Sequence, residues 1–137
     1  MLLPKKPFLA MRIGVSIPFL WCFCRWTEFS RLRSVAGRPL FRWCFKAREA
    51  DLDQGVAYTQ YILSRWPLRL LKQKCLLRSL ALYSILKPFR PVQLVFGVRK
   101  GQSSGQWDGH CWLEIEGKPF LDTREGVSSF ERICVHA

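Results

Sequence analysis

Histidine and acidic side chains are scarce in this chain of 137 residues. It has two histidines, and ten Asp and Glu residues against 22 Lys and Arg residues, which gives a formal net charge of +12 at pH 7. Residues 1–50 carry ten basic and two acidic side chains, whereas residues 51–137 carry twelve and eight. A surplus of this sign attracts acidic peptides, nucleic acid or anionic lipid, or serves only solubility. Charge alone leaves these alternatives open.

The chain also lacks an internal repeat, a low-complexity segment and a hydrophobic run long enough to span a bilayer. Its apolar stretch IGVSIPFLWCFC, residues 13–24, is shorter than the roughly 20 residues that a bilayer requires. No small-x-small cleavage site follows before Arg25, so a signal peptide is not indicated. We expect a buried helix here in a cytoplasmic protein, with a helix on a membrane surface, and hence membrane association, as the alternative.

Metal-ligand spacing is missing as well. The six cysteines include the pair Cys22-x-Cys24, but no second pair or histidine lies near it, so we expect no metal. Cys22, Cys24 and Cys44 lie among aromatic residues and Cys111 lies in a probable strand, which does not resemble a disulfide scaffold. We therefore expect the cysteines to be reduced. We also expect no cofactor, because nothing in the sequence resembles a nucleotide-binding loop.

Helical patterns fill the first part of the chain. Hydrophobic residues make up 49% of the whole chain, which argues against disorder, and its length of 137 residues is that of one domain. We expect helices over residues 13–36, from Asp51 or Asp53 to Trp66, and over residues 75–86, the last nearly continuously apolar and therefore central. The segment 37–49 is ambiguous and is compatible with a short helix.

Strand patterns fill the rest. Residues 91–100 and 110–116 alternate between two faces, and EGK at 116–118 marks a turn to a returning strand at 119–122. The predicted fold class is therefore α+β, with a buried helix packed on an antiparallel sheet. We divide the chain into a basic, apolar helical region at 1–68 and a core at 69–137.

The hairpin can bring His110 and Asp122 together. If the turn has an odd number of residues, such as Glu116-Gly117-Lys118, Asp122 becomes a diagonal neighbour of His110 on the same face. A two-residue turn would send the two side chains to opposite faces. Gly117 favours a bulged turn of odd length, and Cys111 should then face the core.

A histidine oriented by a carboxylate is the base of a nucleophilic triad, and Cys75 is the candidate nucleophile. Cys75 lies at the start of the central helix, whose N-terminal dipole, with Lys72 and Lys74 nearby, favours a thiolate. Each of the three residues alone is compatible with a structural role. Their occurrence in the order Cys, His, Asp, on a helix followed by a sheet, favours catalysis.

These residues also carry a family resemblance. CLLRSLAL at 75–82, LVFGV at 94–98, GHCWLEIEG at 109–117 and FLD at 120–122 resemble the transglutaminase-like leader peptidases of lasso-peptide biosynthesis. The resemblance covers about residues 70–125 and implies a transglutaminase- or papain-like core. The chain departs from the family at Cys111, where alanine is usual; both residues are small.

The resemblance implies a cysteine peptidase that removes the leader from a ribosomally made precursor peptide. Cys75 would be the nucleophile, His110 the general base and then acid, and Asp122 the group that orients the imidazole. It also implies two partners, a separate leader-recognition protein and an asparagine-synthetase-like cyclase. The backbone N–H of Cys75 would supply the oxyanion hole, with Gln73 as a weaker candidate donor. Trp107 and the loop 101–109 are candidates for the peptide groove.

Two other functions remain compatible with the sequence. One is acyl transfer to an amine instead of water, with the same three residues. The other is a non-catalytic basic module that binds nucleic acid or an acidic partner, with Trp and Phe side chains between the charges as stacking platforms. This second reading leaves the triad order unexplained, so nucleic acid is disfavoured as a partner.

Overall fold

The structure is a computed structural model that describes residues 7–26, 48–65, 74–101 and 105–136. In the described part of the chain, three longer helices precede a sheet in which a short helix is inserted, which confirms the α+β prediction. The elements are α1 (Pro7–Trp26), η1 (Glu49–Asp51), α4 (Leu52–Ser64), α5 (Lys74–Leu86), β1 (Val92–Lys100), β2 (Trp107–Ile115), β3 (Lys118–Phe120), α6 (Arg124–Ser128) and β4 (Glu131–His136).

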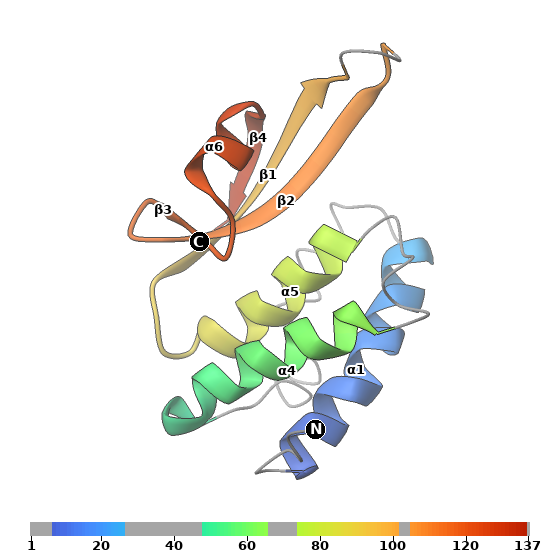
Figure 1. The fold of residues 1–137 in the computed structure, drawn as a ribbon, viewed down its shortest axis with the longest axis vertical. Coiled ribbons are helices and arrows are strands. Elements are labelled where there is room, and N and C mark those ends of the chain that lie inside the picture. Colours follow the sequence, from blue (N-terminus) through green and yellow to red (C-terminus); the bar gives the residue numbers. More distant parts are fainter. Residues whose placement is uncertain (1–6, 27–47, 66–73, 102–104, 137) are drawn as a thin grey trace.

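Helix α5 is the centre of the packing. It contacts α1 and α4 on one side and strands β1 and β2 on the other, so that the helices form one layer and the sheet a second (Figure 1). Nine of its thirteen residues are buried, as its nearly continuous apolar sequence predicts. Ile13 and Ile17 of α1 and Leu63 of α4 join the same core cluster. The helices and the sheet therefore share one hydrophobic core.

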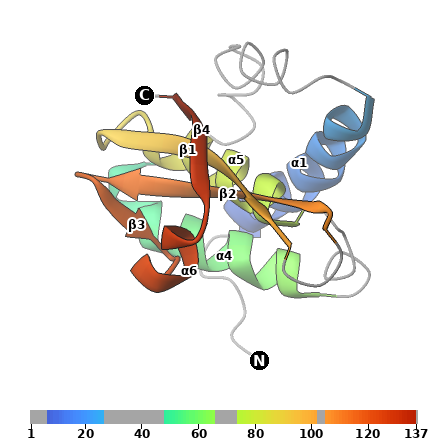
Figure 2. The ribbon, with the colours of Figure 1, turned by 90° about the horizontal axis from the view of Figure 1, so that it is seen from above.

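The sheet is antiparallel, with the strand order β3-β2-β1-β4. Along β2 the side chains alternate as predicted. Cys111 and Leu113 face α5 and the main core, whereas Trp112 packs on the opposite face with Val127 and Phe130. These last two residues belong to the segment from α6 to β4, which lies over the outer face of the sheet (Figure 2). Both faces of the sheet are thus covered near the middle of β2.

The element boundaries agree only in part with the sequence. Helix α1 begins at Pro7, earlier than residue 13, and its predicted end near residue 36 lies outside the described residues. Most of the ambiguous segment 37–49 also lies outside them. Helix α4 follows Asp51 as predicted, although the Asp51 side chain makes no capping hydrogen bond. The division at residue 68 stays a prediction.

The C-terminal segment forms a strand that the sequence pattern did not predict. This strand, β4, pairs with β1 and places Cys134 opposite Phe96. Strand β1 is buried, and its backbone N–H and C=O groups on the side away from β2 need hydrogen-bond partners. Strand β4 supplies them. Within the described residues, no helix is both long and apolar enough to cross a membrane.

Gly97 in β1 offers a test of the packing on the outer face. A Cβ atom there would lie 2.9 Å from Cβ of Phe130 and from the ring of Trp112. We expect Gly97→Ala to lower the free energy of unfolding by about 1–3 kcal/mol, because neither neighbour can move freely. Gly14→Ala in α1 is the control, since its Cβ would meet Ile62 at 3.9 Å. It should raise stability by about 0.5–1 kcal/mol. Equal effects in denaturant unfolding would contradict this packing.

Candidate active site

The turn between β2 and β3 differs from the expected one. Ile115 pairs with Lys118 and Leu113 with Phe120, so the turn consists of Glu116 and Gly117 alone. Both residues have positive φ, 52° and 74°, the pattern of a two-residue type I′ turn. The expectation of an odd-length turn was therefore wrong. In this register a continuous strand would place Asp122 on the face opposite His110.

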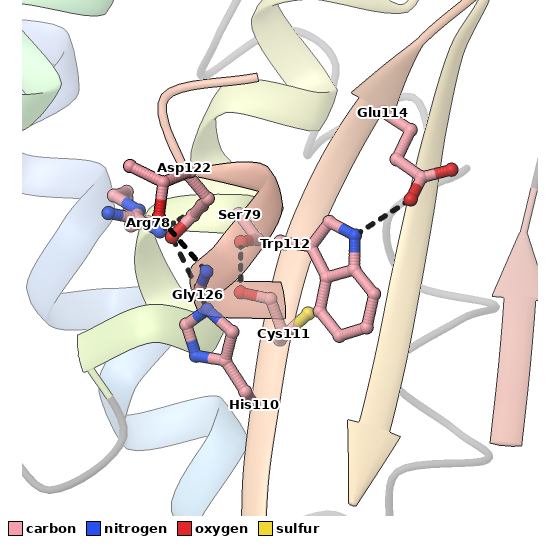
Figure 3. Close-up of polar contacts among 9 residues, drawn as sticks. Arg78, Ser79, His110, Cys111, Trp112, Glu114, Asp122 and Gly126 are labelled. Carbon is pink, nitrogen blue, oxygen red and sulfur yellow. Dashed lines mark hydrogen bonds and ion pairs between the residues drawn. The ribbon is translucent and has the colours of Figure 1, made fainter. Parts of the chain in front are cut away.

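Leu121 reconciles the two-residue turn with the site. Strand β3 ends at Phe120, and Leu121 has a φ of 63°, in the left-handed region that a leucine rarely adopts. At Leu121 the chain leaves the strand conformation, so the side chains that follow no longer alternate between the two faces of the sheet. Oδ1 of Asp122 then lies 3.3 Å from Nε2 of His110, as Figure 3 shows. His110 and Asp122 come together through this turn and not through strand register.

Cys75 meets the other side of the imidazole. It is the second residue of α5 and is half-buried, and its thiol lies within hydrogen-bonding reach of the His110 side chain. Strand β3 pairs only with residues 113–115 of β2, so β2 has a free edge at His110 in the described part of the chain. The histidine can reach Cys75 around this edge. Nε2 faces Asp122, which leaves Nδ1 for the sulfur.

Rings hold the imidazole on the outer face of the sheet. The His110 ring stacks on Trp112, with centroids 5.8 Å apart and an interplanar angle of 19°, and contacts the Phe130 ring at 5.2 Å. Nε1 of Trp112 donates to the buried Glu114 at 3.0 Å, and Arg132 donates to the same carboxylate oxygen at 2.7 Å. The hydrogen bond to Glu114 fixes the plane of the tryptophan against which the histidine lies.

Arg78 is a contact that the sequence did not predict. Its Nη2 atom donates to Oδ2 of Asp122 at 2.6 Å, while Oδ1 faces His110 (Figure 3). The sequence showed Arg78 three residues after Cys75, hence on the same side of the helix. That spacing was the sequence signal from which the place of Arg78 in the site could have been predicted. Phe130, by contrast, carried none, because it approaches His110 only through the tertiary fold.

The charges in the site support a thiolate–imidazolium pair. Burial opposes ionisation of the Cys75 thiol, but hydrogen bonds from His110 and from the backbone of Cys111 outweigh it and lower the pKa of Cys75 below 9.0. The hydrogen bond to Asp122, followed by that to Cys75, raises the pKa of His110 to about 9. Near pH 7 His110 is therefore protonated, and its positive charge shifts the ionisation of Cys75 toward the thiolate.

The other members of the site differ in charge state. Asp122 is desolvated by burial, yet its hydrogen bonds to His110 and Arg78 dominate and lower the pKa of its carboxyl group. Burial, with the nearby Cys75 charge, raises the pKa of Cys111 to about 12. Cys111 is thus an inert thiol that faces the core, next in sequence to the histidine.

The remaining candidates have no role shown in the site. Gln73 and Lys72 lie outside the described residues. The Trp107 side chain is 69% exposed and lines an open pocket of about 700 Å³ with Arg99, Asp108 and Glu131, at the far end of β1 and β2. Among the described residues, no three His, Cys, Asp or Glu side chains form a cluster that could hold a metal ion.

A comparison with known families identifies the superfamily of this chain. The family model of the transglutaminase-like superfamily matches residues 15–135, which is most of the chain. The chain therefore belongs to the transglutaminase-like superfamily, which includes cysteine peptidases and acyltransferases. No curated protein and no solved structure matches it.

The pKa shifts predict selective alkylation. At pH 7 iodoacetamide should modify Cys75 and leave Cys111 unmodified, as mapped by peptide mass spectrometry. His110→Ala removes the side chain that does most to lower the pKa of Cys75, so that burial, which raises this pKa, is opposed only by backbone hydrogen bonds from Cys111 and Leu76. The rate at Cys75 should then fall at least about tenfold at pH 7. As pH falls, the wild type should stay reactive to a lower pH than this variant. Coincident pH profiles would contradict the ion pair.

The backbone of Leu121 can be tested separately. Leu121→Gly should change the free energy of unfolding by less than about 1 kcal/mol, because glycine adopts positive φ without strain. Leu121→Val should lower it by about 1–2 kcal/mol, since a β-branched residue tolerates this conformation least. Leu121→Met is the matched control, because it keeps size and lacks β-branching. If the valine variant is as stable as the methionine variant in thermal unfolding, the left-handed turn is wrong.

Proposed function

We propose that this chain is a cysteine peptidase that removes the leader from a ribosomally synthesised lasso precursor peptide. One observation carries the catalytic part of the proposal. The imidazole of His110 lies between the thiol of Cys75 and the carboxylate of Asp122, with Nε2 turned to the carboxylate. This is the relation of nucleophile, base and orienting group that acyl transfer requires.

Acylation begins with attack of the Cys75 thiolate on the carbonyl carbon of the scissile peptide bond. The oxygen of the tetrahedral intermediate takes the negative charge, and the Cys75 backbone N–H is the proposed donor to it. The His110 imidazolium then gives its proton to the leaving nitrogen, the C–N bond breaks, and the amine product departs. A thioester on Cys75 and a neutral imidazole remain. Asp122 keeps the ring in place through Nε2.

Deacylation reverses these proton transfers. Neutral His110 takes a proton from a water molecule, whose oxygen attacks the thioester carbonyl. The C–S bond breaks, and the carboxylic acid product and the Cys75 thiolate are released with His110 protonated again. If an amine took the place of water, the product would be an amide, the acyltransferase reaction found in the same superfamily.

The substrate and the partners rest on the sequence resemblance. The motif that begins at Cys75, the strand that holds His110 and the FLD segment that ends at Asp122 support a leader peptidase. We propose that the chain acts in the cytoplasm with a separate leader-recognition protein and passes the core peptide to an asparagine-synthetase-like cyclase. Contact with a membrane surface through the basic N-terminal region belongs to the same proposal.

A cleavage assay tests the proposal. A synthetic lasso-type precursor is mixed with the chain and the leader-recognition protein, and products are followed by mass spectrometry. We expect wild type and Cys111→Ala to release the leader and Cys75→Ala to release none. His110→Ala should be slower by about 10²-fold or more, because the proton donor and acceptor is lost.

The products separate the competing functions. Incorporation of ¹⁸O from labelled water into the new carboxylate indicates hydrolysis, whereas a product coupled to an added amine indicates acyl transfer. If Cys75→Ala cleaves like the wild type, Cys75 is not the nucleophile. If no matched precursor is cleaved and the chain instead binds nucleic acid regardless of Cys75, the basic-module function replaces the peptidase.

A further inference from the structure

Asp122 has a second partner besides the histidine. We propose that Arg78 is a positioning residue of the catalytic site, which holds the Asp122 carboxylate against Nε2 of His110. This inference rests on the proposed function for its catalytic meaning. Its geometry, however, depends only on the contacts of Arg78, Asp122 and His110.

The backbone alone does not keep Asp122 in place. Strand β3 is three residues long and ends at Phe120, before the left-handed turn at Leu121. Asp122 therefore lies outside the ladder that would fix a strand residue, and α6 begins only at Arg124. The next residue, Thr123, caps α6, but the carboxylate of Asp122 is oriented by its side-chain contacts, of which that with Arg78, at 2.6 Å, is the shorter.

The carboxylate divides its two oxygens between two partners. Oδ2 accepts from Nη2 of Arg78, and Oδ1 faces Nε2 of His110. Because each oxygen has its own partner, rotation of the carboxylate about its terminal bond would break both contacts. Side-chain exposure is 25% for Arg78 and 16% for Asp122, so water competes weakly for these groups. Charge-assisted hydrogen bonds in such a setting are stronger than neutral ones.

The same helix holds both ends of the His110–Asp122 pair. Cys75 and Arg78 are three residues apart on α5 and so lie on one side of it. Cys75 contacts one side of the imidazole, and Arg78 contacts the carboxylate on the other side. The contacts form a closed ring from Cys75 through His110, Asp122 and Arg78 back to the helix. Helix α5, a single rigid element, thus fixes the position of the nucleophile Cys75 relative to the orienting group Asp122.

Other charged groups near His110 have different partners. Asp108, two residues earlier on β2, is paired with Arg99 at 2.9 Å. Glu114, on the same face, accepts from Trp112 and from Arg132. In the described part of the chain, the side-chain contacts found for Asp122 are those with Arg78 and His110. Arg78 is therefore the cation whose loss should alter the carboxylate.

The positioning role can be distinguished from simple charge balance by the sign of one shift. If Arg78 only balanced charge, its removal would leave Asp122 in place with a stronger field, and the pKa of His110 would rise. If Arg78 holds Asp122 in position, its removal frees the carboxylate to leave Nε2, and the pKa of His110 falls. The two roles give opposite results.

NMR titration of the imidazole protons measures this pKa directly. The chain has two histidines, and His136→Gln assigns the signal of His110. The pKa should be about 9 in the wild type and lower by about one unit or more in Arg78→Met. Arg78→Lys should lie between them, because it keeps the charge but loses the planar guanidinium. Arg90→Met, which removes an exposed positive charge elsewhere, should leave the pKa unchanged.

A double substitution tests whether Arg78 acts through Asp122. Asp122→Asn should lower the pKa of His110, and adding Arg78→Met to it should lower that pKa no further. An unchanged or raised pKa in Arg78→Met, or an equal fall in the presence and absence of the Asp122 carboxylate, would overturn the proposal. Circular dichroism confirms folding of each variant. Should Arg78→Met not fold, the lysine variant decides by the same criterion.

Substrate is not needed for this titration, so its failure is separable from failure of the proposed function. A lowered pKa without any peptidase activity would leave the positioning geometry intact and remove only the function. Where cleavage is observed, Arg78→Met should lower kcat more than it changes KM, because the geometry of proton transfer is altered and not the binding of peptide.

Discussion

The contact of Asp122 with both Arg78 and His110 is the constraint on which the site depends. It joins the helix layer to the sheet layer at the point where the chain has left β3 and has not yet entered α6. Helix α5 is fixed by the shared core, and β2 by its pairing with β1. Asp122 lies between these two rigid parts, so its side-chain contacts fix the position of His110 on β2 relative to α5.

The surroundings of His110 give the two neighbouring cysteines opposite chemistry. Cys75 meets the imidazole where β2 has no strand partner on one side among the described residues, and there hydrogen bonds outweigh the effect of burial and lower its pKa. Cys111 adjoins the histidine in sequence but points into the core, where burial keeps its thiol protonated. Alternation along β2 thus points the Cys111 thiol away from the imidazole, so that of these two thiols only that of Cys75 is activated by His110.

Much of the fold could be predicted from periodicity, because local patterns report which face of an element is buried. The helix predicted over 75–86 agrees with α5 within one residue. The strand predicted over 110–116 ends one residue earlier, at Ile115, and begins three residues earlier, at Trp107. The turn after Ile115 could not be predicted reliably, since its length depends on how the following segment packs. The proximity of His110 and Asp122 was predicted, but through an odd-length turn that does not exist.

The sequence by itself determined the order of Cys75, His110 and Asp122, the helix-then-sheet layout and the inward direction of Cys111. These features follow from spacing along the chain. The tertiary structure alone decided the left-handed turn at Leu121, the pairing of Arg78 with Asp122 and the contact of Phe130 with His110. Each of these joins segments far apart in sequence or stabilises a locally unfavourable backbone, which packing can do and local preference cannot.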